Sequence, residues 1–299
     1  MVVLHWGDKT ATLACLGSVA RSELMARPLV VIDNGTGALS PDEVARTAPG
    51  AEFITVPENL GFAAGSNLGI RRALAAGADF VLLLNNDATL EPACLAALVR
   101  VARSAPDVAA VGAKVLSAAD PRIVWLAWGR LTYRAALVEF VGRGQADGPR
   151  FGAVREVDWV PGCAMLLTRA AIARVGLLDE RFFAYHEDVD WCTVARARGL
   201  RILFAPDARV IHFGEGSLAP RGPANPARYL SARNTVLFAR KHARAREWMR
   251  LALTVGVSLP PEAIRRWRRG EARAVALLLR GYLDGLLGRE LPLRALGLR

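Results

Sequence analysis

The sequence predicts an α/β fold whose mostly parallel sheet carries helices on both faces. Apolar runs at residues 2–6, 28–37, 51–59 and 80–90 alternate with segments of helical periodicity. Each run opens with a largely apolar stretch that shows no strict alternation with polar residues, which is typical of strands buried on both faces of a parallel sheet. No run of about 18 apolar residues occurs, so no transmembrane helix is expected. The amino terminus begins as a strand and lacks the basic and apolar regions of a signal peptide.

The remaining elements follow the same alternation. Ser66 or Asn67 is expected to cap the helix over 65–78, and Gly77 to end it. Pro92 suits the first turn of the next helix. Residues 118–157 are less regular and suggest hairpins or loops that could cover a site. The predicted strands after residue 90 are 108–116, 159–168, 201–204 and 209–212, the last leading into a glycine-rich loop, and the predicted helices are 8–24, 65–78, 91–106, 169–175 and 188–199.

Charge separates the carboxyl-terminal part of the chain from the rest. The net charge is +11, and residues 228–299 hold all of this excess, with 16 Lys and Arg against 5 Asp and Glu. The pattern there is helical and is expected to break at residues 258–262. A neutral body with a basic tail suggests an anionic partner for the tail. The four cysteines show no CxxC spacing and are expected to be buried thiols.

Polar residues follow three of the predicted strands at their carboxyl ends. These segments are DNGTG (33–37), ENLGFAAGSN (58–67) and NND (85–87). Ligands of such sheets bind beyond the carboxyl ends of the strands, so their convergence indicates a binding site. Each segment also has a plainer interpretation, because Asn, Asp and Gly favour turns and Ser and Asn favour helix caps.

The order of these segments resembles family 2 glycosyltransferases of the GT-A fold, especially their rhamnosyltransferase-like members. The resemblance rests on VVIDNGTG, ENLGFAAGSNLGIRRAL and FVLLLNND, then on the long block from Pro161 to Gly216, and finally on YLSARN. It covers about residues 2–240. It implies a catalytic domain over 1–227, with a nucleotide-sugar half (1–117) and an acceptor half (118–227), followed by the basic helical tail (228–299).

The resemblance assigns a nucleotide-sugar wall. Asp33 would hydrogen-bond the nucleotide base, with Thr36 near the role of a hydroxyl that the family often places there. Arg233 could contact the diphosphate. A helix beginning near Ser66 would offer free N–H groups to phosphate. The full set of nucleotide-sugar residues is Asp33, Asn34, Asn59, Gly65, Asn67, Asn86 and Arg233.

A metal site is implied at residues 85–87. Mg²⁺ and Mn²⁺ prefer oxygen ligands and take few carboxylates together with substrate phosphates. Asp87 would be a direct ligand, and His212 would lie opposite it. Asn85 stands where the family's D-x-D motif has its first aspartate, so its contact would be weaker or through water. For His212 a purely structural role is the alternative.

The segment HEDVD (186–190) carries three carboxylates beside an aromatic loop. Carboxylates beside apolar surface have raised pKa values that suit a general base, although acids also favour helix N-termini. By resemblance the second acid of the pair removes the proton from the acceptor hydroxyl. Asp188 is therefore the expected base, with Glu187 as its neighbour, and Asp190 is expected at the helix end or against substrate.

The predicted function is metal-dependent, inverting glycosyl transfer from a nucleoside diphosphate sugar. The resemblance favours dTDP-rhamnose as donor, with a UDP-hexose second, and a glycan or polyprenyl-diphosphate-linked acceptor in polysaccharide synthesis. The tail suggests a peripheral position on the inner face of the cell membrane, or simple packing on the catalytic domain. The alternatives are a sugar nucleotidyltransferase and a non-catalytic basic membrane or nucleic-acid binder. Nucleic-acid binding is not expected, because no readout motif is present.

Overall fold

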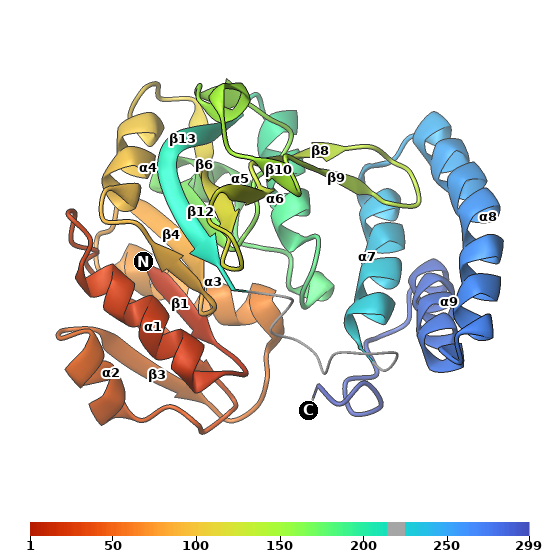
Figure 1. Cartoon of the computed structure of the whole chain (residues 1–299), viewed down its shortest axis with the longest axis horizontal. Helices are drawn as coiled ribbons and strands as arrows, with labels where there is room; N and C mark the ends of the chain where they lie inside the picture. The colour runs from red at the N-terminus through yellow and green to blue at the C-terminus, as the bar shows by residue number, and fades with distance from the viewer. Residues whose placement is uncertain (214–224, 299) are drawn as a thin grey trace. The chain divides into compact units, whose positions relative to one another are not determined.

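The computed structural model describes residues 1–213 and 225–298, which form two compact units (Figure 1). The first unit comprises Met1–Arg130, Phe140–Phe183 and Glu187–Ser217, and the second comprises Leu131–Glu139, Ala184–His186 and Leu218–Arg299. The glycine-rich segment predicted after His212 lies outside the described residues. The boundary near residue 227 stays a prediction.

The first unit contains the α/β sheet that the apolar runs predict. Four parallel strands lie in the order β3-β2-β1-β4, and they span Glu52–Val56, Val30–Asn34, Val2–His5 and Phe80–Asn85. Val2 pairs with Val30 on one side and with Leu83 on the other. Both faces of β1 and β2 are buried, which explains why these strands are apolar without alternation.

The sheet continues beyond β4 with strands of mixed direction. β12 (Ala164–Thr168) runs antiparallel to β4 and to β6 (Val108–Ser117), and β13 (Arg201–His212) runs parallel to β6. The predicted strands 201–204 and 209–212 are thus one strand, with a register shift between Ala205 and Arg209. β5 (Ala88–Leu90) pairs with β13. The irregular segment 118–157 forms further short strands: β7 (Ile123–Leu126), β10 (Gln145–Ala146) and β11 (Arg155–Glu156) in the main sheet, and β8 (Trp128–Leu131) and β9 (Val138–Val141), which pair with each other in a separate two-stranded sheet.

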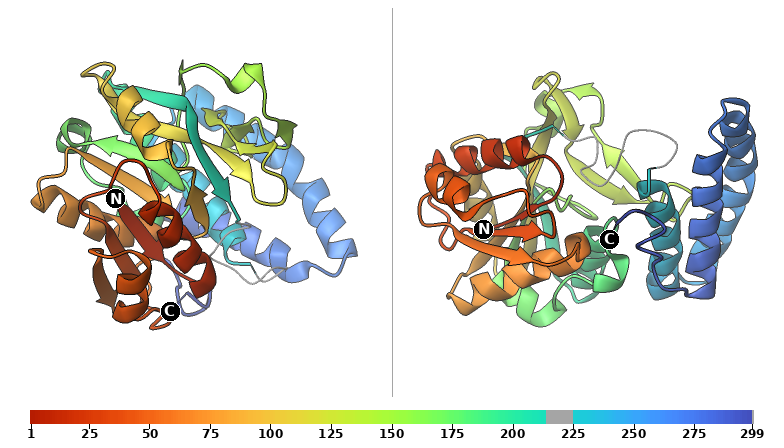
Figure 2. Two further views of the ribbon diagram at one scale, coloured as in Figure 1. Left: turned by 60° about the vertical axis from the view of Figure 1, so that its left-hand side comes forward. Right: turned by 90° about the horizontal axis from the view of Figure 1, so that it is seen from below.

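Helices cover both faces of the parallel strands (Figure 2). α1 (Lys9–Ala20) packs with α2 (Pro41–Thr47) on one face, and α3 (Gly61–Ala75) contacts β1, β2 and β4 from the other. α4 (Cys94–Ala102), α5 (Arg169–Val175) and α6 (Glu187–Ala197) cover β6, β12 and β13. The α/β fold with helices on both faces is as predicted.

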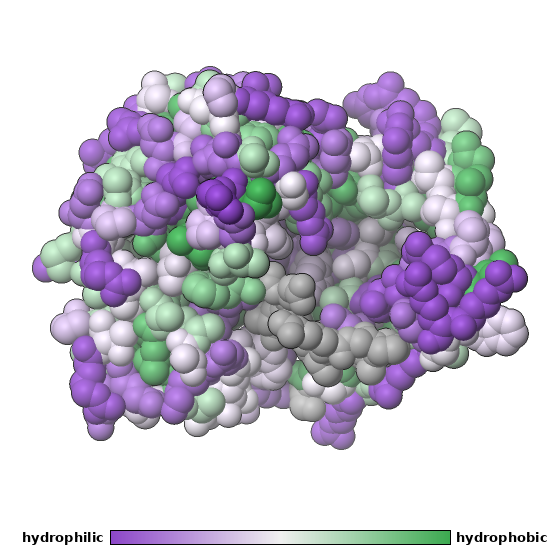
Figure 3. All heavy atoms as spheres, in the orientation of Figure 1, coloured by the Kyte–Doolittle hydropathy of each residue, from purple (hydrophilic) through white to green (hydrophobic). Residues whose placement is uncertain are grey.

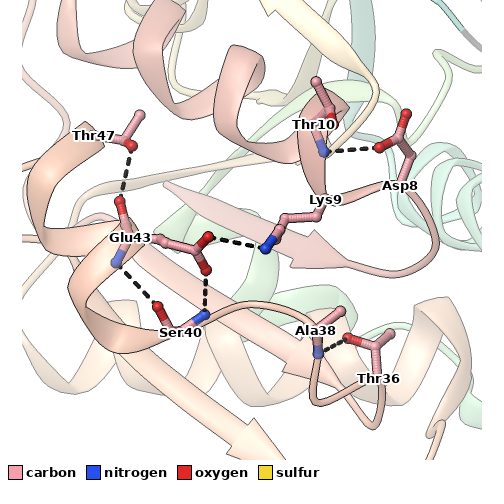
Figure 4. Close-up of polar contacts among 8 residues, drawn as sticks. All are labelled: Asp8, Lys9, Thr10, Thr36, Ala38, Ser40, Glu43 and Thr47. Carbon is pink, nitrogen blue, oxygen red and sulfur yellow. Dashed lines mark hydrogen bonds and ion pairs between the residues drawn. The ribbon is translucent and has the colours of Figure 1, made fainter.

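The sequence interpretation missed α2, although a capping signal marks its start. Ser40 Oγ accepts a hydrogen bond from Glu43 N–H, and the Glu43 carboxylate accepts one from Ser40 N–H (Figure 4). Pro41 follows the cap, as the sequence S-P-D-E would have indicated. Lys9 Nζ also donates to Glu43 at 2.9 Å, which ties α1 to α2.

The predicted start of the helix at 65–78 is wrong. α3 begins at Gly61, four residues earlier, and Ser66 and Asn67 lie buried inside it. The reason is tertiary: Asn34 Oδ1 accepts from Leu60 N–H and Asn59 Oδ1 accepts from Gly61 N–H. These bonds satisfy the orphan donors of an earlier helix start, so no cap at Ser66 is needed.

The described residues of the second unit form the helices α7 (Ala227–His242), α8 (Ala245–Arg268) and α9 (Ala272–Leu287). α9 packs closely on α7, because Gly281 and Gly285 let the backbones of the two helices approach. The predicted break at residues 258–262 is wrong, because α8 continues through Pro260 and Pro261. Gly256 and Val257, whose carbonyls lose the proline N–H partners, are exposed, so water can replace those bonds. No helix within 1–213 or 225–298 has the length and apolar character needed to span a bilayer.

Candidate active site

Three strands of the parallel sheet end side by side with polar residues. His5 on β1 pairs with Asp33 on β2, and Leu4 pairs with Asn85 at the end of β4. The carboxyl ends of parallel strands share one edge, so the DNG and NND segments lie on neighbouring strands there. The edge therefore brings together the polar segments that the sequence singled out.

Asp33 and Asn34 organise the nucleotide side of this edge. Asp33 Oδ1 accepts hydrogen bonds from Thr36 N–H (2.9 Å) and Thr36 Oγ1–H (2.6 Å). Its other oxygen, Oδ2, is buried and has no hydrogen-bond partner among the described residues. Asn34 Nδ2–H donates to Asn59 Oδ1 at 2.9 Å and so ties β2 to the loop before α3. The DNG segment thus forms the turn that its residue types favour, and Asp33 also keeps one buried oxygen without a partner among the described residues.

Gly65, Asn67 and Asn86, the other nucleotide residues predicted in the first unit, contact neighbouring parts of the protein. A Cβ on Gly65 would lie 2.6 Å from Leu4, so glycine is needed for α3 to pack on β1. The Asn67 amide donates to Leu178 O at 2.9 Å and accepts from Leu178 N–H at 3.0 Å. Asn86 Nδ2–H donates to Trp6 O and to Thr12 Oγ1. Their contacts with a nucleotide stay a prediction.

The expected phosphate site at a helix start near Ser66 is wrong, because the helix begins at Gly61. At the true start, Leu60 and Gly61 donate their N–H groups to Asn34 and Asn59, and Ala63 N–H donates to Phe183 O. Those donors are therefore occupied by protein oxygens.

Asp87 and His212 meet because β5 pairs with the end of β13. Ala88 pairs with His212, and Phe213 N–H donates to Asp87 O at 2.9 Å. His212 Nε2 lies 3.1 Å from Asp87 Oδ1 and 3.5 Å from Asn85 Nδ2. The Trp125 ring packs on the imidazole with a centroid distance of 4.6 Å. All three predicted metal residues thus converge at the end of β4.

The donor atoms of this cluster suit a divalent cation. Asp87 Oδ1 is buried and accepts no hydrogen bond from the described residues, although His212 Nε2 faces it. A carboxylate oxygen, an imidazole nitrogen and an amide are ligands that Mn²⁺ or Mg²⁺ accepts. The described residues contain no group of three or more His, Cys, Asp and Glu side chains placed so that they could hold a metal ion by themselves. A cation here would therefore need further oxygen ligands, as substrate phosphates supply.

The acid pair at the start of α6 connects to this edge through residues 162–163. Gly162 N–H donates to Asp188 Oδ2 at 2.8 Å, and Cys163 O accepts from Asn85 N–H at 3.0 Å. The pKa of the Cys163 thiol is raised by burial and then by the charges of both Asp87 and Asp188. The acid pair and the end of β4 are therefore joined by hydrogen bonds to two consecutive residues, Gly162 and Cys163.

The two acids of the pair differ in access. Glu187 is buried, and its Oε2 has no partner within the described parts of the chain, whereas Asp188 is half-buried. Burial raises the pKa of both carboxyls, and the Asp188 charge raises the pKa of Glu187 further. A carboxyl with a raised pKa that a substrate can reach suits a general base, which favours Asp188.

Residues 184–186, which belong to the second unit and come directly before the acid pair in the sequence, form a strained segment. Tyr185 and His186 have φ values of 71° and 72°, which non-glycine residues rarely adopt. Asn234 on α7 holds this segment, because its Nδ2 donates to Ala184 O and Tyr185 O, each at 2.8 Å. Arg233 Nη1–H in turn donates to Asn234 Oδ1 at 3.1 Å.

The hydrogen bonds of Asn234 give the SARN segment a role that the sequence did not predict: it holds residues 184 and 185. Arg233 was predicted at the diphosphate, but its guanidinium contacts Asn234 and Arg289 O. Asn234, which was not among the predicted site residues, is fully buried and uses both amide hydrogens. The dipeptide was visible in the sequence, but its target 50 residues away was not. A contact of Arg233 with a substrate stays a prediction.

Comparison with known sequences identifies the family. A family model described as glycosyltransferase like family 2 matches residues 1–246. An N-acetylglucosaminyl-diphospho-decaprenol L-rhamnosyltransferase of Mycobacterium tuberculosis is 25% identical over 246 residues, which are 76% of this chain and 79% of that protein.

Solved structures agree with the fold. A structure of GalNAc-T7 with UDP, GalNAc and Mn²⁺ matches 80% of this chain and 47% of its own, with a TM-score of 0.61 and 14% identity. A mannosyltransferase from Pyrobaculum calidifontis in complex with GDP-Man and Mn²⁺ matches 97% of this chain and 87% of its own, with a TM-score of 0.54 and 16% identity. The sheet with its polar strand ends and the family match over most of the chain lead to one conclusion: this protein belongs to glycosyltransferase family 2 and is a glycosyltransferase.

Proposed function

We propose that this glycosyltransferase moves a sugar, with inversion, from a nucleoside diphosphate sugar to a hydroxyl of a polyprenyl-linked glycan. The observation that carries the proposal is the link from Asp188 through residues 162–163 to Asn85. It joins an accessible carboxyl of raised pKa to the strand end that bears Asp87 and His212. A base and a diphosphate site on opposite sides of one reacting carbon are what inversion requires.

The donor would lie along the polar edge of the sheet. Asp33 Oδ2 is the free acceptor for an N–H of the nucleotide base, and Asn34 and Asn59 shape the adjoining loop. Asp87 and His212, with Asn85 beside them, would hold Mn²⁺ or Mg²⁺. When bound, such a cation neutralises negative charge on a diphosphate leaving group.

The acceptor hydroxyl would lie against Asp188. Its oxygen attacks the anomeric carbon while its proton passes to the Asp188 carboxylate, and the bond between that carbon and the diphosphate oxygen breaks. Gly162 N–H orients the carboxylate, since it donates to Oδ2 at 2.8 Å. Glu187, which is buried, is the supporting acid rather than the base.

The favoured donor is dTDP-rhamnose, with a UDP-hexose as the second choice. Support comes from the Mycobacterium tuberculosis relative, which is an L-rhamnosyltransferase named for a decaprenyl-diphosphate-linked N-acetylglucosamine. A substrate of that kind would place the reaction at the inner face of the cell membrane, in polysaccharide synthesis.

Replacement of the proposed base is the direct test. Asp188→Asn should lower the transfer rate by roughly 10²–10⁴-fold, the usual share of a general base, with donor binding retained. Glu187→Gln should cost less, and Asp207→Asn, on an exposed ion pair of β13, should cost nothing. Transfer at the normal rate by Asp188→Asn would show that the base is misassigned, and selective loss in Glu187→Gln would exchange the two roles.

The pH profile gives a second measurement on the same variants. Burial raises the Asp188 pKa, so the carboxylate form is lost at a higher pH than for an ordinary aspartate. Transfer should therefore fall as pH decreases through that raised pKa. The fall should persist in Glu187→Gln, because burial and not the neighbouring acid is the main cause of the Asp188 shift.

A further inference from the structure

Large apolar side chains are exposed along one face of α8. They are more than half exposed, from 52% for Ile264 to 72% for Trp267. Consecutive members are separated by four, four, seven and three residues, which places them on one face of a helix. We call this set the α8 stripe; its members are Met249, Leu253, Val257, Ile264 and Trp267.

The α8 stripe is distinct from the face by which the helix packs in its own unit. Leu251, which is buried, lies on the other side of the helix from Leu253. α9 shows the same division: Leu279, Leu283, Leu286 and Leu287 are exposed, whereas Ala274, Gly281, Asp284 and Gly285 are buried. Both helices thus carry one packed face and one exposed apolar face. Exposed apolar surface of this kind marks an interaction site.

The charge around the α8 stripe is positive. Residues 228–299 carry the entire net charge of +11. Arg268 and Arg269 are exposed beside Trp267, and neither has an ion pair among the described residues. Figure 3 shows hydrophilic and apolar surface side by side over α8. Arginine next to exposed Leu, Ile and Trp is typical of helices that lie in the headgroup region of an anionic bilayer.

The prolines of α8 also suit that environment. Pro260 and Pro261 cannot donate to the carbonyls of Gly256 and Val257, and all four residues are exposed. Free carbonyls need a hydrogen-bond donor, which hydrated headgroups supply and a dry apolar interface does not. The depth implied is therefore interfacial.

From these observations we infer that α8 binds anionic phospholipid through the α8 stripe, which enters the interfacial layer while the neighbouring arginines contact headgroup phosphates. The inference rests on the proposed function only for the purpose of membrane binding, which is to bring the enzyme to a lipid-linked acceptor at the same membrane surface. Binding itself requires neither donor nor acceptor, so the two proposals can fail separately.

The test uses the full chain and vesicles of phosphatidylcholine with or without phosphatidylglycerol. Leu253→Glu/Val257→Glu places two carboxylates on the α8 stripe. Ala252→Glu/Ser258→Glu adds the same charge at exposed positions of the same helix outside the stripe and serves as the matched control. In co-sedimentation, the wild type should bind the anionic vesicles and the stripe variant should bind at least about tenfold more weakly, with the control closer to the wild type.

Two further measurements make the result decisive. Transfer to a soluble acceptor should be the same for wild type and both variants, which separates a lost surface from a lost fold. Equal loss of vesicle binding in both variants, or no binding by the wild type, would overturn the inference. So would light scattering that shows a wild-type dimer and a monomeric stripe variant, because the stripe would then be an interface between copies of this chain.

Discussion

Asp87 and His212 illustrate how much of a site depends on single atoms. Their side chains face each other at 3.1 Å, yet Asp87 Oδ1 accepts no hydrogen bond from a described residue. An unsatisfied buried carboxylate oxygen is costly in a structural role, whereas a cation ligand requires such an atom. Asn85 adds no charge to the cluster. In the proposed metal site, Asp87 is therefore the only one of these three side chains that would offset the charge of a cation with its own negative charge.

We expect Asn234 to position the acid pair, because it holds the two residues that lie shortly before Glu187. Asn234→Asp keeps the shape of the side chain but removes the two N–H donors to Ala184 and Tyr185. Because this segment leads directly into Glu187 and Asp188, kcat should fall by about 10- to 100-fold, as misplaced catalytic groups do, with little change in donor KM. Steady-state kinetics would measure this split.

The control for this prediction separates positioning from general damage to the fold. Asn234→Asp should leave donor affinity near that of the wild type. A parallel loss of donor affinity, or an unchanged kcat, would show that Asn234 does not position the acids.

At the residue scale, the predicted metal residues meet in the structure, while their binding of a metal stays a prediction. Asp87, Asn85 and His212 were predicted as a cluster from their resemblance to the family, and the structure brings them together. Gly65 and Asn67 were predicted at the nucleotide, and the structure gives both a packing contact instead of an open surface. A small residue that allows a close approach looks the same in sequence whether a ligand or another strand approaches it.

Among the helices, the pair α7 and α9 depends on glycines spaced four residues apart. A Cβ on Gly285 would lie 2.8 Å from Arg233 O and 2.9 Å from Val236 Cβ, and a Cβ on Gly281 would lie 2.4 Å from Tyr229 O. Gly285→Ala should therefore force the helices apart and destabilise the second unit by about 1–3 kcal/mol. Denaturant unfolding followed by circular dichroism would measure the change.

Gly256→Ala in α8 is the matched control for this prediction. A Cβ there meets no atom within 4 Å, so the higher helix propensity of alanine should stabilise the chain by about 0.5–1 kcal/mol. If both variants shift stability in the same direction, close packing of α7 and α9 is not the cause.

Helix boundaries show why some elements escaped sequence interpretation. α3 begins at Gly61 because Asn34 and Asn59 accept its first N–H groups, and Asn34 lies 26 residues before Leu60. α8 continues through two prolines because its freed carbonyls are exposed. Local helix propensity and the unsatisfied backbone groups set the free-energy cost of a helix boundary at each position. Hydrogen bonds from residues distant in sequence, or from water, decide whether that cost is compensated.

For the molecule as a whole, donor binding should appear as added stability. A ligand that binds only the folded state at 100 times its Kd adds about 2.7 kcal/mol. A thermal-shift panel of dTDP-rhamnose and UDP-hexoses, each with and without Mn²⁺ or Mg²⁺, should give the largest shift for dTDP-rhamnose with metal. Asp87→Asn should lose the metal-dependent part of the shift and keep the nucleotide-dependent part.

Two results of this panel would contradict the proposed metal site. One is a shift that is the same with and without metal in the wild type. The other is a full metal-dependent shift in Asp87→Asn. Asp207→Asn, on an exposed ion pair, is expected to behave as the wild type throughout.

By itself, the sequence determined the α/β class, the polar strand ends, the family and the separation of a neutral body from a basic tail. These follow from periodicity, composition and motif order, all of which are local along the chain. Only the tertiary structure decided which atoms meet. The pairing of β5 with β13 brings His212 to Asp87, and the packing of α7 places Asn234 on residues 184 and 185. Such contacts join residues 50 to 125 positions apart, and no local pattern encodes the strand pairing or helix packing that closes those loops.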